Sequence, residues 1–160
     1  MTSDQLRKIL EDLVNDPKMV PHDTDGVPGD ETFCNIAVQR ICVAFGFKAF
    51  EGMLANDMLK TLESGKAEGW KACTGEEAAA HALSGGLAVA GKRYEKHGHI
   101  AVVWPGSMDF SPSFGKMVPM LANVGGRDKN GVPMNGVKNM GWFFSSKKGE
   151  PGYWKFKQGE

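Results

Sequence analysis

The chain has 160 residues, and its 19 basic and 19 acidic side chains cancel, with the Lys and Arg residues scattered along the sequence. This length suits a single domain over 1–160, and the balanced, dispersed charge argues against nucleic acid as the main partner. No apolar run approaches the ~20 residues of a membrane span, so we expect no membrane insertion.

The first residues, Met1–Leu6, lack the basic and apolar blocks of a secretory signal. We therefore expect synthesis in the cytoplasm, with any export following a route that needs no cleaved signal. Apolar residues at helical spacing then predict a first helix with Ser3 as its N-cap. They are Leu6, Ile9, Leu10, Leu13 and Val14.

From Pro17 to Asp30 the composition turns to Pro, Gly and Asp, which predicts a surface loop that forms one wall of a cleft. The run Asp23–Gly26 resembles part of a calcium-binding loop. Its glycine comes two positions too early for an EF-hand, however, and no Glu occupies the twelfth position. Turn chemistry is therefore the preferred interpretation.

Cys34 stands at the start of an apolar segment whose helical spacing predicts a second helix, capped by Glu31 or Thr32. In the first turn, unpaired backbone N–H groups and the positive end of the helix dipole stabilise a thiolate. A thiol placed there can have a pKa well below the ordinary ~8.5 and act as a nucleophile. The alternative is a buried cysteine that acts only as a small apolar side chain.

The next apolar spacing predicts a third helix over Ala49–Leu62, then a polar connection in which Trp70 lies over the core. Thr74 and Glu77 have the spacing of a capping box, which predicts a short helix over Gly75–Leu83.

Beyond Gly86 the pattern changes from helical to strand-like. Leu87–Ala90 and His99–Trp104 predict an antiparallel hairpin, and further strands are predicted within Met117–Gly125, Met140–Ser145 and Tyr153–Phe156. Helices followed by strands indicate an α+β domain, with N-terminal helices packed on a mainly antiparallel sheet.

A nucleophilic thiol needs a base, and His99 is the best placed of the four histidines, because it begins the most apolar strand. An imidazole there must be hydrogen-bonded or face a cleft. His22 lies in the loop, His81 in a short helix and His97 in a turn, and each is better explained as solvated or structural.

A third group must orient the imidazole ring. Asn123 is polar within an otherwise apolar strand, and its side-chain oxygen can accept the ring N–H from the neighbouring strand. The alternatives are that Asn123 only satisfies a turn, or that Asp109 fills the third position. The three cysteines cannot all pair, and a bridge between Cys42 and Cys73 stays open. No Cys/His pattern has zinc-ligand spacing, so we expect no metal and no cofactor.

Three motifs follow one another in this chain: Phe33–Asn35 opens a helix, Leu87–Ala90 forms a strand, and Gly98–Val103 precedes Pro105-Gly106. This order resembles the papain-like NlpC/CHAP class of cell-wall amidases and endopeptidases. The resemblance spans 32–125, and its closest layout is that of the small amidase effectors of type VI secretion. This chain differs from the usual pattern of that class in two positions: Asn35 stands where an Asp or Ser is common, and the third residue is Asn123.

The resemblance implies a papain-like domain in which Cys34 attacks an amide of the peptidoglycan peptide stem, commonly the bond between D-glutamate and diaminopimelate, with His99 as base. It implies action in the periplasm or at the cell wall, as an interbacterial toxin effector or a phage lysin. An effector would also have an immunity protein that blocks its cleft.

Two other functions are compatible with the same residues. One is a papain-like peptidase or acyltransferase that acts on proteins. The other is a non-catalytic phage or secretion-system domain with an inert Cys34, in which the thiol would react no faster than those of Cys42 and Cys73.

Overall fold

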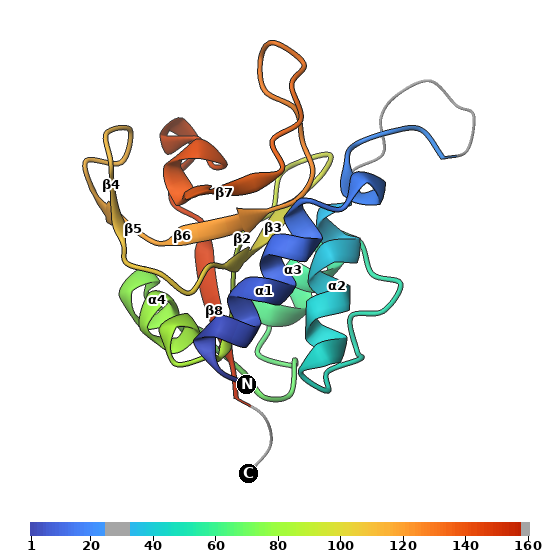
Figure 1. Cartoon of the computed structure of the whole chain (residues 1–160), viewed down its shortest axis with the longest axis vertical. Coiled ribbons are helices and arrows are strands. Elements are labelled where there is room, and N and C mark those ends of the chain that lie inside the picture. The colour runs from blue at the N-terminus through green and yellow to red at the C-terminus, as the bar shows by residue number, and fades with distance from the viewer. Residues whose placement is uncertain (25–32, 158–160) are drawn as a thin grey trace.

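A computed structural model describes residues 1–24 and 33–157 (Figure 1). The predictions for Asp25, Gly26, Glu31 and Thr32 lie outside these residues. The helices in the described part are α1 (Ser3–Val14), α2 (Cys34–Ala44), α3 (Ala55–Glu63) and α4 (Gly75–Leu83), with short 3-10 turns at Pro17–Met19, Met140–Trp142 and Ser146–Lys148. The strands are β1 (Trp70–Cys73), β2 (Leu87–Lys92), β3 (His99–Val103), β4 (Asp109–Ser111), β5 (Lys116–Val118), β6 (Met120–Asn123), β7 (Gly136–Asn139) and β8 (Gly152–Phe156).

Six of these strands form one sheet in the order β1-β8-β2-β3-β6-β7, and every neighbouring pair is antiparallel. The last strand, β8, lies between β1 and β2, so the C-terminal segment joins β1 to the rest of the sheet. The strands β4 and β5 pair separately as a short ribbon. The structure is therefore an α+β fold with a mainly antiparallel sheet, as the sequence predicts.

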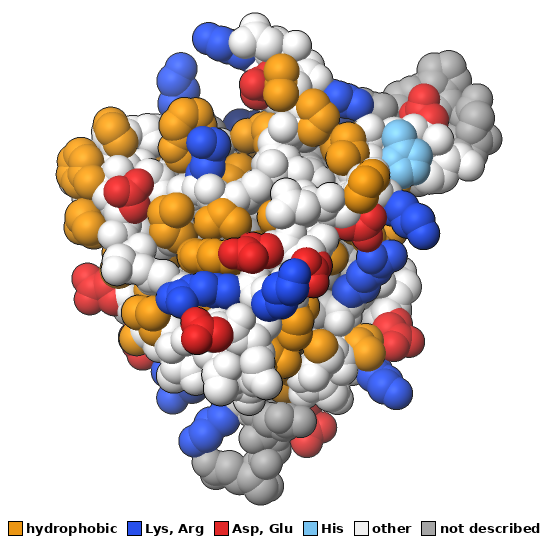
Figure 2. Space-filling view, viewed as in Figure 1, with side chains coloured by type: hydrophobic (Ala, Val, Ile, Leu, Met, Phe, Trp, Pro, Cys, Tyr) orange, Lys and Arg blue, Asp and Glu red, His pale blue; other side chains and the backbone are white. Residues whose placement is uncertain are grey.

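Side chains alternate between the two faces of this sheet, and each face is covered by helices (Figure 1). Helices α1, α2 and α3 cover one face, where Val89, Ile100 and Val102 belong to the larger apolar cluster. Helix α4 covers the other face, where Ala101 and Val103 belong to a second cluster. On the face of the molecule shown in Figure 2, acidic and basic side chains are intermixed, and apolar side chains gather over the β4–β5 ribbon.

Several local predictions are confirmed. Helix α4 has the predicted bounds, and Thr74 and Glu77 form the capping box. The β2–β3 hairpin has the predicted antiparallel pairing, and Trp70 is buried in the larger cluster. Helix α1 is also present, but its N-cap is Thr2 rather than Ser3, because Thr2 and Gln5 satisfy each other's backbone N–H groups.

Other predictions are wrong. The segment after Met140 is a 3-10 turn, while the strand beside β6 is the preceding β7. The predicted strand from Met117 is two strands, β5 and β6, separated at Pro119, whose missing N–H cannot continue the ladder. The third helix begins six residues later than predicted, at Ala55.

Candidate active site

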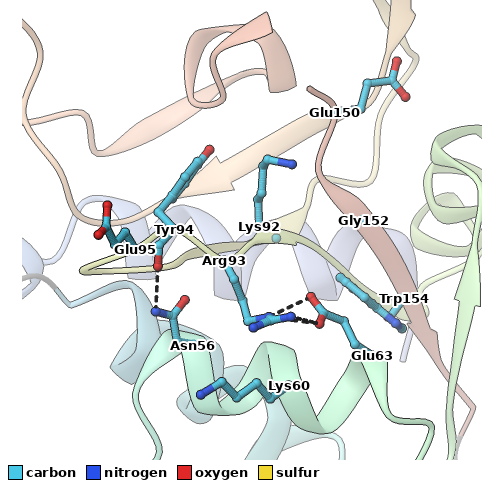
Figure 3. A pocket seen from close by; sticks show the side chains of 11 residues that line it. Asn56, Lys60, Glu63, Lys92, Arg93, Tyr94, Glu95, Glu150, Gly152 and Trp154 are labelled. Atoms are coloured by element: carbon cyan, nitrogen blue, oxygen red, sulfur yellow. Dashed lines mark hydrogen bonds and ion pairs between the residues drawn. The ribbon is translucent and has the colours of Figure 1, made fainter. Parts of the chain in front are cut away.

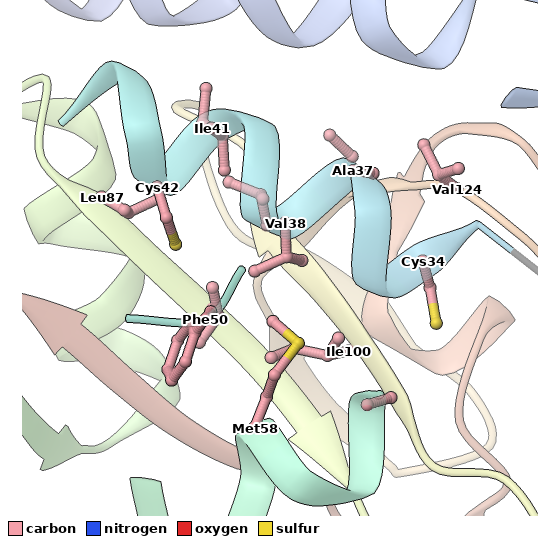
Figure 4. Packing of buried hydrophobic residues seen from close by; sticks show 14 of the residues in the cluster. Cys34, Ala37, Val38, Ile41, Cys42, Phe50, Met58, Leu87, Ile100 and Val124 are labelled. Atoms are coloured by element: carbon pink, nitrogen blue, oxygen red, sulfur yellow. The ribbon is translucent and has the colours of Figure 1, made fainter. Parts of the chain in front are cut away.

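Cys34 is the first residue of α2, and Phe33 takes the N-cap position without a side-chain hydrogen bond. The first helical bond runs from the Ala37 N–H to the Phe33 carbonyl, at 2.9 Å, so the N–H groups of Cys34, Asn35 and Ile36 have no acceptor within the helix. Figure 4 shows Cys34 at this end of α2, with its side chain directed away from Val124. The position predicted for the sulfur, in the first turn, is confirmed.

A hollow of about 480 Å³ opens at Cys34. Its walls come from the start of α2, from the start of α3 with the preceding Leu54, and from the turn Lys96–Gly98 that leads into β3. Leu54 is among the most exposed apolar side chains, at 67%. The hollow therefore has an apolar rim at Leu54, and the residues directly before His99 form the opposite wall. Cys34 lies at its inner side and is only 3% exposed.

His99, half-buried at the start of β3, has the hydrogen bond that the sequence predicts: its ring Nε2 lies 2.5 Å from the Oδ1 atom of Asn123. The amide nitrogen of Asn123 donates to the carbonyl oxygens of Gly125, at 3.2 Å, and Met134, at 3.0 Å. Because both amide hydrogens are used, the oxygen must face the ring and accept. The hydrogen of a neutral His99 is therefore on Nε2, and Nδ1 is the nitrogen that can take up a proton.

Burial lowers the pKa of His99 below its ordinary value, and the hydrogen bond to Asn123 raises it by a smaller amount. The ring of Phe144 lies beside the imidazole, with 5.4 Å between the centroids, and contributes to this apolar environment. The neutral imidazole is thus favoured near neutral pH. In that form it can act as a general base.

Cys34 and the His99–Asn123 pair lie at the same end of β6. Gly125, two residues after that strand, has a φ of +93°, and a Cβ atom added there would lie 3.3 Å from the backbone nitrogen of Cys34. His99 shares the sheet face of Ala101, whereas Cys34 belongs to the cluster on the opposite face. The thiol and the imidazole therefore reach this end of the sheet from its two faces.

Side chains of the loop between β6 and β7 hold this end of the sheet in place. The N–H of Gly125 donates to Asn135 Oδ1 at 2.9 Å, and the amide nitrogen of Asn135 donates to the Met19 carbonyl at 2.9 Å. Arg127 also donates to the Pro21 carbonyl, at 2.9 Å. The loop after α1, predicted to form a cleft wall, is thus tied to the residues that contact Cys34.

Asp109, the alternative third residue, is not beside His99. Its carboxylate accepts a hydrogen bond from the amide nitrogen of Asn139 at 2.8 Å. Asn139 pairs with Met120 at the beginning of β6, whereas Asn123 is at the end of that strand. The structure therefore brings Asn123, and not Asp109, to the imidazole.

The other histidines have structural contacts. The ring of His81 bonds the Phe156 carbonyl at 2.8 Å, and that of His22 bonds the Val20 carbonyl at 2.6 Å and stacks on Phe33. His97 is exposed on the wall of the Cys34 hollow. Of the four rings, His99 is the one that combines burial with an orienting side chain.

All three cysteines lie in the described part of the chain, and they form no disulfide. Burial raises the pKa of Cys42 to about 12 and that of Cys73 to about 11. Neither thiol ionises near neutral pH, so Cys42 and Cys73 are unsuited to nucleophilic attack. Within 1–24 and 33–157 no three His, Cys, Asp or Glu side chains are placed to hold a metal ion.

Sequence reasoning missed two residues of this site, Gly125 and Asn56. The Gly125-Gly126 pair signals a turn, but not its contact with Cys34. Asn56 lies in the first turn of α3 and donates to the Tyr94 carbonyl at 3.0 Å. Its position in the sequence carries no signal of this contact, because the pairing is between segments 38 residues apart.

Comparison with known proteins does not add a family to these observations: no protein-family model matches the chain, and no curated protein matches it closely. Among the described residues, no helix is both long enough and apolar enough to cross a membrane.

Proposed function

We propose that this protein is a papain-like cysteine amidase of the NlpC/CHAP type, which cleaves an amide bond in the peptide stem of bacterial peptidoglycan. The observation that carries the proposal is the hydrogen bond between His99 and Asn123, whose amide has a fixed orientation. This pair lies at the same end of the sheet as Cys34, the first residue of α2. The preference for the cell wall over a protein substrate comes from the sequence resemblance.

In the proposed reaction, Nδ1 of His99 takes the proton of the Cys34 thiol as the sulfur attacks the carbonyl carbon of the amide. The negative charge on the carbonyl oxygen is stabilised by the backbone N–H groups that begin α2. The carbon–nitrogen bond then breaks, and His99 gives its proton to the leaving amine. The acyl group is left on sulfur as a thioester.

A water molecule completes the reaction. His99 takes a proton from the water as it attacks the thioester, and the second tetrahedral intermediate collapses to a carboxylic acid and the Cys34 thiol. Asn123 holds the ring throughout, because its amide hydrogens are engaged by two backbone carbonyls. Such an enzyme would act at the cell wall after export, as a toxin effector or a lysin.

Digestion of purified peptidoglycan tests this proposal. The expected products are stem fragments with one new amine and one new carboxylate, identified by mass spectrometry, from the native chain but not from Cys34→Ala. Cys42→Ala is the control, because its thiol lies outside the site. Cleavage of a protein substrate and not of peptidoglycan would favour the peptidase. An uncleaved substrate, with Cys34 alkylated no faster than Cys42 and Cys73, would favour the non-catalytic domain.

A further inference from the structure

A side chain of α3 holds the turn that leads into His99. This turn, 93–98, joins β2 to β3, and the ladder between these strands ends where Lys92 pairs with His99. The amide nitrogen of Asn56, in the first turn of α3, donates to the Tyr94 carbonyl at 3.0 Å (Figure 3). The residues before His99 are therefore attached to α3 as well as to β2.

The side-chain oxygen of Asn56 makes a second contact, with Gly98, the residue directly before His99. A Cβ atom at Gly98 would overlap with this oxygen. In glycine a hydrogen takes the place of Cβ, so a Cα–H of Gly98 points at the oxygen, which is the geometry of a weak C–H···O contact. Among the described residues, this buried oxygen has no N–H or O–H donor. The amide cannot turn over, because its oxygen would then face the Tyr94 carbonyl.

This contact, and not the backbone conformation, excludes a side chain at position 98. The φ of Gly98 is not in the left-handed region. After the oxygen, the atoms nearest to an added Cβ would be the Cγ and the backbone nitrogen of Asn56, at 3.1 and 3.2 Å. Without the Asn56 side chain beyond its Cβ, a methyl group at position 98 would need a shift of only a few tenths of an ångström. Gly98 and Asn56 are therefore complementary in size.

An ion pair also joins α3 to this turn. The Nη2 atom of Arg93 and the Oε2 atom of Glu63 lie 2.8 Å apart, and both side chains are exposed (Figure 3). Exposed pairs of this kind contribute little to stability. The ion pair is at the start of the turn, whereas Asn56 reaches its last residue. Asn56 is therefore the side chain of α3 that bears directly on the residue before His99.

We propose that Asn56 is a positioning residue for His99. Through Gly98 it fixes the beginning of β3, and with it the place of the imidazole relative to Cys34. The inference rests on the proposed function. Asn123 holds one ring nitrogen of His99 from β6, and Asn56 holds the main chain from which the ring projects. Asn56 and Gly98 line the hollow that opens at Cys34, so a shift of the turn moves the proposed base relative to the proposed nucleophile.

A double-mutant cycle in the intact protein tests this role. Two rates are measured: cleavage of peptidoglycan, and alkylation of Cys34 by iodoacetamide, located by mass spectrometry. In Gly98→Ala the methyl group pushes the turn away from Asn56, and cleavage should fall about a hundredfold, the effect of a misplacement of ~1 Å. Asn56→Ala should lower cleavage about tenfold, since the turn is released but not displaced. Alkylation should slow in the same order of variants, because it depends on the same imidazole.

The double variant Asn56→Ala/Gly98→Ala gives the decisive comparison. The added methyl group takes the space left by the Asn56 side chain, so the loss should stay at about tenfold, whereas independent effects would multiply to about a thousandfold. Gly86→Ala is the matched control: its Cβ would overlap with the His81 imidazole, at the end of β2 opposite to Lys92. This control should lose stability and keep both rates.

Multiplied losses in the double variant, or an equal slowing in Gly86→Ala, overturn the positioning role while leaving the proposed function intact. Should Gly98→Ala fail to fold, Asn56→Ala decides alone, and unslowed alkylation in this variant overturns the role. If the native protein cleaves no peptidoglycan, the proposed function fails, and the alkylation rates still decide whether Asn56 places His99 at Cys34.

Discussion

Replacing Asn123 by alanine separates the orienting role of this side chain from its structural role. Asn123 is fully buried, and it makes three hydrogen bonds, one to His99 and two to backbone carbonyls. Asn123→Ala leaves three buried or half-buried polar groups without their partner, at roughly 1–3 kcal/mol each where water cannot enter. Partial access of water reduces the sum to an expected loss of about 3–5 kcal/mol. A domain of ordinary stability, ~5–15 kcal/mol, remains folded at 25 °C.

The same change should lower kcat/KM by a factor on the order of ten to a few hundred, because the His99 ring loses the acceptor that fixes its orientation and tautomer. The thiol should keep its reactivity toward iodoacetamide. Asn139→Ala is the matched control: this side chain is also buried and also makes three hydrogen bonds, to Asp109, Phe110 and Gly141, at the other end of the β6–β7 pair. It should lose stability and keep its activity.

The pH profile provides a readout that a loss of stability alone would not change. The bond from Asn123 raises the pKa of His99, so without it the pKa falls further below the ordinary 6.5. Since the base must be neutral, the acidic limb of kcat/KM should move to lower pH in Asn123→Ala and stay in place in Asn139→Ala. If both variants lose activity equally, or if the limb of Asn123→Ala moves to higher pH, then Asn123 does not orient a basic His99.

Three further predictions follow from the same geometry. Cys34→Ala should abolish cleavage, whereas Cys42→Ala should retain turnover. Each variant should lose about 1–2 kcal/mol in chemical denaturation, because both side chains are buried in the larger apolar cluster and each change leaves a cavity. His99→Ala should slow both cleavage and Cys34 alkylation by several orders of magnitude. His99→Ala should also flatten the pH dependence of stability. The half-buried ring of the native protein has a lowered pKa, so the unfolded chain binds more protons between that pKa and ~6.5, and the native protein loses stability as pH falls through this window. EDTA should leave cleavage unchanged, and a loss restored by added zinc or calcium would contradict the metal-free mechanism.

The parts of the fold that the sequence predicts correctly are those determined by short-range chemistry. The capping box of Thr74 and Glu77 needs only a spacing of three residues, and the bounds of α4 follow from it. The β2–β3 hairpin follows from two apolar runs around a polar turn. The position of Cys34 at the start of α2 follows from the helical spacing of the residues after it.

The parts that the sequence does not predict depend on long-range pairing. β8 lies between β1 and β2, and the register that joins Trp70 to Phe156 cannot be read from either segment alone. The same limit applies to the third residue of the site. Asn123 and Asp109 are both plausible from their neighbours, and only the pairing of β6 with β3 and β7 places one beside His99 and the other beside Asn139.

The geometry around Asn123 also explains why an amide, rather than the carboxylate of an aspartate, suits this position. The side chain must accept one hydrogen bond from the imidazole and donate two to the carbonyls of Gly125 and Met134. An ionised carboxylate has no hydrogen to donate, and it would be buried against two carbonyl oxygens. The same amide that orients His99 thus holds the loop whose Gly125 packs against the backbone of Cys34. The placement of the proposed base and that of the proposed nucleophile therefore depend on one side chain.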